Sequence, residues 1–154
     1  MVASAWIGDA LDGAVARFTD TESLSGAWLD FVGDRLCITT LCLVLTRVAD
    51  LGTAPLLFAV HYLTLDAIVT TAFRYFDIGS PNYFFLVDEL MFRSNWSIPA
   101  KLLSQAPLAL LLVGSSGRLY LLSMALIIVW KGLMVARLHI LRRRHGQNAT
   151  AGIE

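Results

Sequence analysis

The stretch LYLLSMALIIVWKGLMVARLHIL, residues 119–141, is a long and mostly apolar run. An α-helix rises 1.5 Å per residue, so about 20 residues cross the hydrocarbon layer of a bilayer. The apolar residues form a continuous block rather than one face of an amphipathic helix. We therefore predict that this stretch is a transmembrane helix.

The composition of the whole chain supports a membrane protein. Its 154 residues are enough for one domain, and 56% of them are hydrophobic while only 16% are charged. Soluble domains usually carry more charge than this. The formal net charge is zero, which gives no reason to expect nucleic-acid binding. We expect contact with membrane lipids and no nucleic-acid partner.

Three more apolar blocks lie before residues 119–141 in the chain: Phe31–Val48, Ala54–Phe76 and the shorter Leu102–Val113. Pro107 lies inside the short block and predicts a kink, because proline has no backbone N–H to donate. The predicted fold class is all-α: a polytopic membrane helix bundle with about four full transmembrane helices and a short N-terminal helix.

The remaining segments are a link and a tail. We expect the link, residues 77–99, to lie partly in the membrane interface, where aromatic side chains reach headgroup level. The tail, residues 142–154, opens with three arginines and is predicted to be a disordered cytoplasmic extension of the membrane domain, residues 1–141. In the link, the aromatic residues that we expect at headgroup level are Tyr83, Phe84, Phe85, Phe92 and Trp96.

The basic residues predict the orientation. Only Arg47 and Arg118 fall on one side of the predicted bundle, while the other arginines and lysines fall on the side of the opening stretch. Basic residues concentrate on the cytoplasmic side of membrane proteins. We therefore expect an integral protein with its site facing the cytoplasm, and the excess of arginine over lysine suggests a bacterial plasma membrane.

The opening stretch carries an unusual set of polar residues. On a helix, Asp9, Asp12, Gly13, Ala16 and Arg17 share one face. After a polar link, a second helix places Gly26, Asp30 and Asp34 on one face, at intervals of four residues. If the two helices fold back as a hairpin, four carboxylates converge.

Four carboxylates in one place repel each other unless cations compensate them. Oxygen ligands suit hard divalent ions, Mg²⁺ or Mn²⁺, and two such ions could bridge a diphosphate. The small residues leave room for a ligand near the backbone, and Arg17 suits a phosphate oxygen. These residues predict a metal–diphosphate site.

The same stretch closely resembles the CDP-alcohol phosphatidyltransferase family. The family signature is D-x2-D-G-x2-A-R-x8-G-x3-D-x3-D, and this sequence meets it at all fixed positions. A weaker similarity is Lys101 with Gln105, where members often have Gly-Lys and then Gln; here Ala100 replaces the glycine. The matching signature residues are Asp9, Asp12, Gly13, Ala16, Arg17, Gly26, Asp30 and Asp34.

The resemblance implies an enzyme that transfers a substituted phosphate from a CDP-linked donor to an acceptor alcohol and releases CMP. The donor in most bacterial members is CDP-diacylglycerol, and the products are phospholipids. By position in the signature, Asp9, Asp12, Asp30 and Asp34 would hold two metal ions, and Asp34 would also be the general base. Gly13, Ala16, Arg17 and Gly26 would bind the CDP group. Members commonly form homodimers, which we expect here too.

Four basic residues are candidates for binding a polar or phosphorylated acceptor alcohol: Arg74, Lys101, Lys131 and Arg137. Snorkelling towards the interface is the alternative role for such residues. Within the second apolar block, His61 and Asp66 are five residues apart and not strictly on one face. We expect them to take part in interhelical hydrogen bonds.

Two other function classes remain open. Members of the family usually have six spans, and their N-terminal spans have no counterpart before Asp9. The chain could therefore be a catalytically inactive, truncated homologue that acts as a membrane partner protein. It could also be an ion-handling protein that uses the carboxylates as a cation site.

Overall fold

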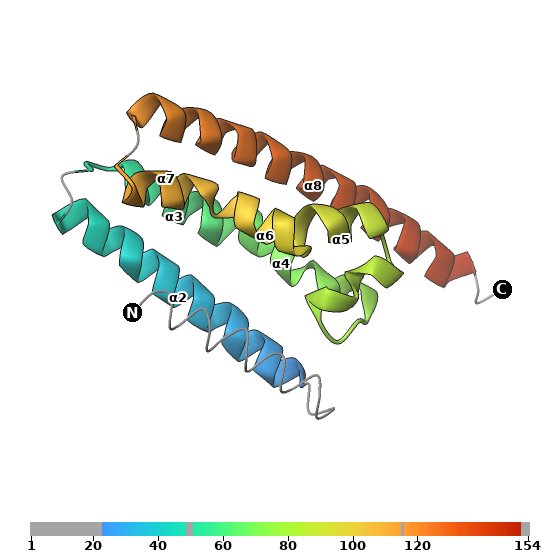
Figure 1. Ribbon diagram of the computed structural model, residues 1–154. Helices are drawn as coiled ribbons and strands as arrows, with labels where there is room; N and C mark the ends of the chain where they lie inside the picture. Colours follow the sequence, from blue (N-terminus) through green and yellow to red (C-terminus); the bar gives the residue numbers. More distant parts are fainter. Residues whose placement is uncertain (1–22, 49–50, 115, 152–154) are drawn as a thin grey trace.

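The computed structural model describes residues 23–48, 51–114 and 116–151, and every regular element in these ranges is a helix. Figure 1 shows α2 and α8 on opposite sides of a middle group formed by the other helices. The all-α bundle predicted from the sequence is thus confirmed for this part of the chain.

Helix α2 (Leu24–Val48) carries the second half of the signature and the first apolar block as one continuous helix. The Oγ atom of Ser23 accepts a hydrogen bond from the backbone N–H of Gly26 at 3.0 Å, so it satisfies one of the free donors of the first turn. The helix therefore begins seven residues before the predicted span and carries Gly26, Asp30 and Asp34 on the same helix as the first apolar block.

The second apolar block is a helical rod with the predicted bounds, Ala54–Phe76. It consists of α3 (Ala54–His61), the π-helical turn η1 (Tyr62–Asp66), α4 (Ala67–Thr70) and the 3₁₀ helix η2 (Thr71–Phe76). The rod ends at Asp77, whose backbone is left-handed with φ of 52°. Asparagine and aspartate tolerate this conformation better than most residues.

The link after this rod contains the 3₁₀ helix η3 (Pro81–Leu86) and α5 (Glu89–Asn95). Tyr83 and Phe85 are exposed, as expected for residues at an interface. Phe84 and Trp96 are instead buried and stack with their ring centroids 4.5 Å apart. These two rings therefore join the protein core, and the expected position of the five aromatic residues at headgroup level stays a prediction.

The third apolar block is divided into α6 (Ile98–Ser104) and α7 (Ala106–Leu112). The interruption falls at Gln105, two residues before Pro107. The predicted kink is confirmed, since proline removes a hydrogen bond from the preceding turn. The two short helices together are shorter than a full bilayer crossing.

The last helix, α8, runs from Gly117 to Ala151. The prediction of a disordered tail after Leu141 is wrong for residues 142–151, because the helix continues through them. Arg142 contributes to this extension by placing its guanidinium 4.3 Å from the centre of the Tyr75 ring on η2. Arginine also has high helix propensity, which favours continuation of the helix.

Two helical stretches are long and apolar enough to cross a membrane, Ala54–Phe76 and Gly117–Gln147. Helix α2 is long enough but carries Asp30, Asp34, Arg35 and Arg47. Many large apolar side chains are exposed, which is costly in water but favourable in lipid. On α8 these include Leu119, Leu121, Leu122, Leu126, Val129 and Leu133.

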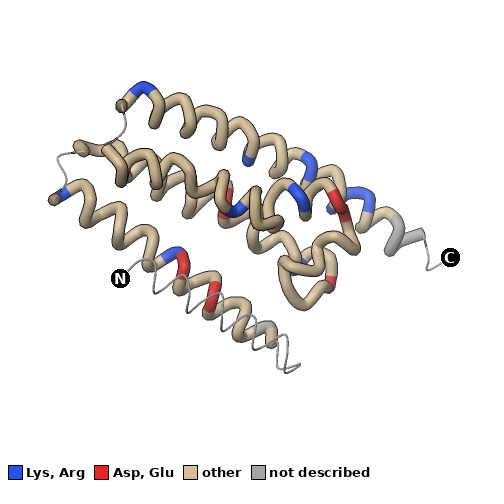
Figure 2. Tube along the Cα trace, in the orientation of Figure 1, with Lys and Arg blue, Asp and Glu red and all other residues tan. Residues whose placement is uncertain are grey.

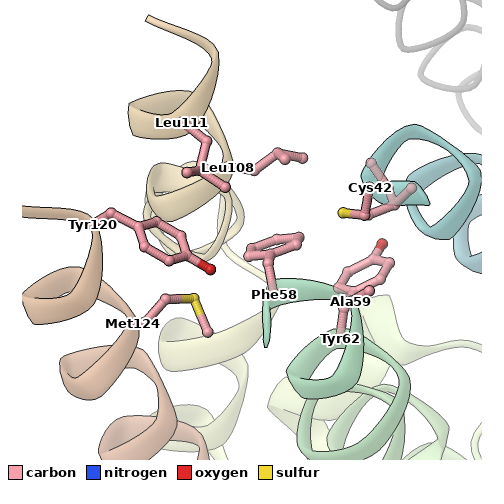
Figure 3. Close-up of a cluster of buried hydrophobic side chains, with 9 residues drawn as sticks. Cys42, Phe58, Ala59, Tyr62, Leu108, Leu111, Tyr120 and Met124 are labelled. Atoms are coloured by element: carbon pink, nitrogen blue, oxygen red, sulfur yellow. The ribbon is translucent and has the colours of Figure 1, made fainter. Parts of the chain in front are cut away.

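The bundle has two apolar clusters. The first joins α2, α3, α7 and α8, and Figure 3 shows Phe58 and Tyr120 near its centre. The hydroxyl of Tyr120 donates a hydrogen bond of 2.6 Å to the carbonyl of Ala54. The second cluster joins the C-terminal half of the rod to the link and α8 through residues such as Phe73, Phe84 and Leu138.

Candidate active site

The described half of the signature lies on the N-terminal part of α2. Gly26, Asp30 and Asp34 follow each other at intervals of four residues and are all exposed. Residues four apart on a helix are neighbours on its surface, with about 5–6 Å between their Cβ atoms. Figure 2 shows the acidic positions of α2 near its N-terminal end. The predicted shared face of these residues is confirmed.

The other signature residues, Asp9, Asp12, Gly13, Ala16 and Arg17, lie outside the described residues. Within the described ranges, no group of three or more histidine, cysteine, aspartate or glutamate side chains could hold a metal ion. The four-carboxylate site therefore remains a prediction, and α2 carries two of its four predicted ligands, Asp30 and Asp34.

The chemistry of these two ligands fits a hard divalent ion. Asp30 and Asp34 offer only carboxylate oxygens, which Mg²⁺ and Mn²⁺ prefer. Both side chains are exposed, so an ion could reach them without opening the core. Gly26 has no side chain that would cover the adjacent backbone. A Cβ atom at this position would lie 3.1 Å from the Oγ of Ser23.

An open cavity of about 370 Å³ lies between the N-terminal part of α2 and η2 and is lined by Trp28, Thr71, Arg74 and Tyr75. The guanidinium of Arg74 sits 5.1 Å from the centre of the Trp28 ring. Arg74 is exposed, so its charge is accessible beside the signature helix. Of the four predicted acceptor residues, Arg74 is thus placed at a cavity next to the signature helix.

Lys131 and Arg137 occupy different surroundings. Lys131 is buried, and its Nζ atom lies 2.8 Å from Oδ1 of Asp66 and 3.0 Å from Oδ1 of Asn95. Arg137 forms two contacts with Asp88, of 2.7 and 3.2 Å. Both cations thus already interact with internal carboxylates, whereas the side chain of Lys101 is exposed on α6.

Asp88 also caps α5 by accepting a hydrogen bond of 2.8 Å from the backbone N–H of Met91. Burial alone would raise the pKa of this carboxyl, but the hydrogen bonds from Arg137 and Met91 outweigh burial and lower the pKa below its ordinary value. Asp88 is therefore ionised at neutral pH and ties the link to α8.

Arg35, which follows Asp34 directly, is a residue of this region for which no role was predicted from the sequence. Its Nη2 atom donates to Oδ2 of Asp66 at 2.8 Å and to Oγ1 of Thr70 at 3.1 Å. The guanidinium lies 3.7 Å from the centre of the Tyr62 ring. A useful signal was present in the sequence: ionisable residues inside apolar segments usually pair with one another.

The interhelical role expected for Asp66 is confirmed, but its partners are Arg35 and Lys131. His61 is buried, and neither of its ring nitrogens has a hydrogen-bond partner within the described structure. The expectation of a hydrogen bond is therefore wrong for His61. The π-helical turn between His61 and Asp66 widens the helix, so residues five apart come closer to one face than in an α-helix.

Comparisons with known proteins agree with the signature. The model of the family described as CDP-alcohol phosphatidyltransferase matches residues 1–138. No curated protein and no solved structure matches the chain. The match covers most of the sequence, including both halves of the signature and most of the last apolar block, and we conclude that this chain belongs to the CDP-alcohol phosphatidyltransferase family.

Proposed function

We propose that the protein transfers a phosphatidyl group from CDP-diacylglycerol, or another CDP-alcohol, to a polar acceptor alcohol and releases CMP in phospholipid biosynthesis. Family membership supports transfer from a CDP-alcohol donor to an alcohol. The lipid donor, the pathway and the activity of this chain belong to the proposal. The site would face the cytoplasm, and the protein would act as a homodimer.

The observation that carries the proposal is the complete signature, with its second half on one exposed face of a rigid helix. The spacing keeps Asp30 and Asp34 one helical turn apart. Asp9 and Asp12 would complete a set of four carboxylate ligands, and Gly13, Ala16, Arg17 and Gly26 would receive the CDP group.

The reaction needs one proton transfer and one displacement at phosphorus. The acceptor hydroxyl oxygen would attack the phosphorus that carries the lipid, and its proton would pass to the Asp34 carboxylate. The bond from this phosphorus to the bridging oxygen then breaks, and CMP leaves with that oxygen. Two bound Mg²⁺ or Mn²⁺ ions would neutralise the diphosphate charge and acidify the acceptor hydroxyl.

The surroundings of the basic residues favour Arg74 and Lys101 for contact with the acceptor. Both are exposed, and Arg74 lines the cavity beside α2. Lys131 and Arg137 would have to leave their carboxylate partners before they could bind a ligand. We propose that their main contribution is to the bundle rather than to the acceptor.

The test is CMP release by the full chain in lipid vesicles that contain CDP-diacylglycerol, with Mg²⁺ or Mn²⁺ and a set of polar alcohols. The variant Asp34→Asn should abolish release and leave folding intact. A matched control is Asp77→Asn, which changes an exposed aspartate whose left-handed backbone also suits asparagine.

Metal-dependent CMP release that Asp34→Asn abolishes and Asp77→Asn preserves would support the proposal. Release by Asp34→Asn at the native rate would exclude Asp34 as the base. No release by the native chain with any acceptor would overturn the enzymatic function and favour the inactive homologue or the ion-handling protein.

A further inference from the structure

The signature residues Gly26, Asp30 and Asp34 lie on the exposed N-terminal part of α2. From Ser25 to Asp34, every side chain is exposed or only partly buried. Arg35 is the first buried side chain along the described part of α2, and it follows Asp34 directly. The buried contacts of Arg35 therefore tie the part of α2 next to Asp34 to the rest of the bundle, while Trp28 contacts Arg74 of η2 near Asp30.

Asp66 is the centre of this attachment. Its Oδ2 atom binds Arg35 from α2, and its Oδ1 atom binds Lys131 from α8, each at 2.8 Å. The Lys131 ammonium also contacts Asn95 at the end of α5. One carboxylate thus connects α2, the middle rod and α8, and all three charged side chains are buried.

The Arg35 guanidinium is also held by two aromatic rings. It lies 3.7 Å from the ring centre of Tyr62 and 4.8 Å from that of Phe31. A planar guanidinium between rings and a carboxylate has a defined orientation, which the single charge of a lysine would not have. These contacts give the Arg35 side chain a defined orientation between α2 and the middle rod.

We infer that Arg35, Asp66 and Lys131 position the signature carboxylates by locking the rotation of α2. This inference rests on the proposed function. Carboxylate oxygens lie about 5 Å from the helix axis, so a rotation of about 20° would move them by about 2 Å. Mg²⁺ requires ligand distances near 2.0–2.1 Å in almost ideal geometry, so it would not tolerate that movement.

A buried ion network is weak evidence for stability. Well-packed apolar side chains often stabilise a protein at least as well as a buried ion pair does, because the charges lose their hydration. A defined geometry is what a buried pair adds beyond apolar packing. In this bundle, that geometry is imposed one residue away from Asp34.

The test measures Mn²⁺ affinity by electron paramagnetic resonance on the full chain, together with kcat and KM for CMP release. In Arg35→Met we expect Mn²⁺ binding to weaken about tenfold and kcat to fall about 100-fold. A purely electrostatic role predicts the opposite for the metal, since loss of a nearby cation would tighten Mn²⁺ binding. Tighter binding in Arg35→Met would therefore overturn the inference.

Two more variants separate positioning from stability. Arg35→Lys keeps the charge but loses the planar contacts, so its Mn²⁺ affinity should lie between those of the native chain and Arg35→Met. The double variant Arg35→Met/Asp66→Asn removes one cation and one anion, so its thermal stability should exceed that of Asp66→Asn alone. Its Mn²⁺ affinity should stay weak, and recovery of the affinity together with stability would overturn the inference.

Tyr120→Phe is the matched control, because it removes a partly buried hydrogen bond from the other end of the bundle. It should lower the unfolding temperature and leave Mn²⁺ affinity unchanged. Equal loss of affinity in this variant would show that any loss of stability disturbs the site, against the inference. Metal affinity is read without turnover, so absent CMP release in the native chain would count against the proposed function alone.

Discussion

The apolar cluster around Phe58 and the ion network around Asp66 adjoin one another, and Tyr62 belongs to both. The apolar cluster is held by many van der Waals contacts that depend little on direction. A small displacement of one side chain therefore costs little energy in any single contact. Bonding in the second depends on three charged groups at 2.8 Å, and its strength falls when their geometry changes. The comparison suggests that the apolar cluster supplies stability and the ion network supplies alignment.

The largest expected effect is that of Asp66→Asn on the ion network. It leaves the cations of Arg35 and Lys131 buried without their carboxylate, so the free energy of unfolding should fall by about 3–5 kcal/mol. Denaturant unfolding in detergent would measure this loss.

Lys131→Met is the matched comparison within the same network. It leaves Arg35 and Asp66 as a neutral pair, so only about 1–2 kcal/mol should be lost, mainly because Asn95 loses its donor. If Lys131→Met lowered the free energy of unfolding more than Asp66→Asn does, the number of unpaired buried charges would not explain the stability of the network.

A cavity in the apolar cluster should have the next largest effect. Met124 is 1% exposed, and Met124→Ala should lower the free energy of unfolding by about 3 kcal/mol. Because this site is in the cluster that we associate with stability, Mn²⁺ affinity should stay native at temperatures where the variant remains folded. A parallel loss of affinity would erase the distinction between the two regions.

The smallest expected effect concerns the ion pair of Asp88 and Arg137. The pKa of Asp88 is lower in the folded chain than its ordinary value near 3.9, so its contribution to stability is complete above that value. The contribution is lost as the pH falls through the lowered pKa. Unfolding temperatures measured between pH 6 and pH 3 should therefore show a decrease below about pH 4.

In Asp88→Asn, that part of the pH dependence should disappear, while Glu89→Gln on the exposed neighbouring pair should preserve it. A decrease of the same size in Asp88→Asn would assign the pH dependence to other carboxyl groups.

Several elements could be predicted from the sequence because their causes are local. The rod Ala54–Phe76 follows from an apolar block of bilayer length, and the break at Gln105 follows from Pro107. The face shared by Gly26, Asp30 and Asp34 follows from helical periodicity. The extension of α8 beyond Leu141 was missed because polar composition suggested disorder, whereas contacts such as that of Arg142 with Tyr75 favour the helix.

The sequence by itself determined that the chain forms apolar helices and carries the complete signature of a CDP-alcohol phosphatidyltransferase. Only the tertiary structure decided which charges meet: it paired Asp66 with Arg35 and Lys131, and Asp88 with Arg137. The physical reason is that helix periodicity acts over a few neighbouring residues, whereas the pairing of buried charges depends on the packing and rotation of helices far apart in the chain.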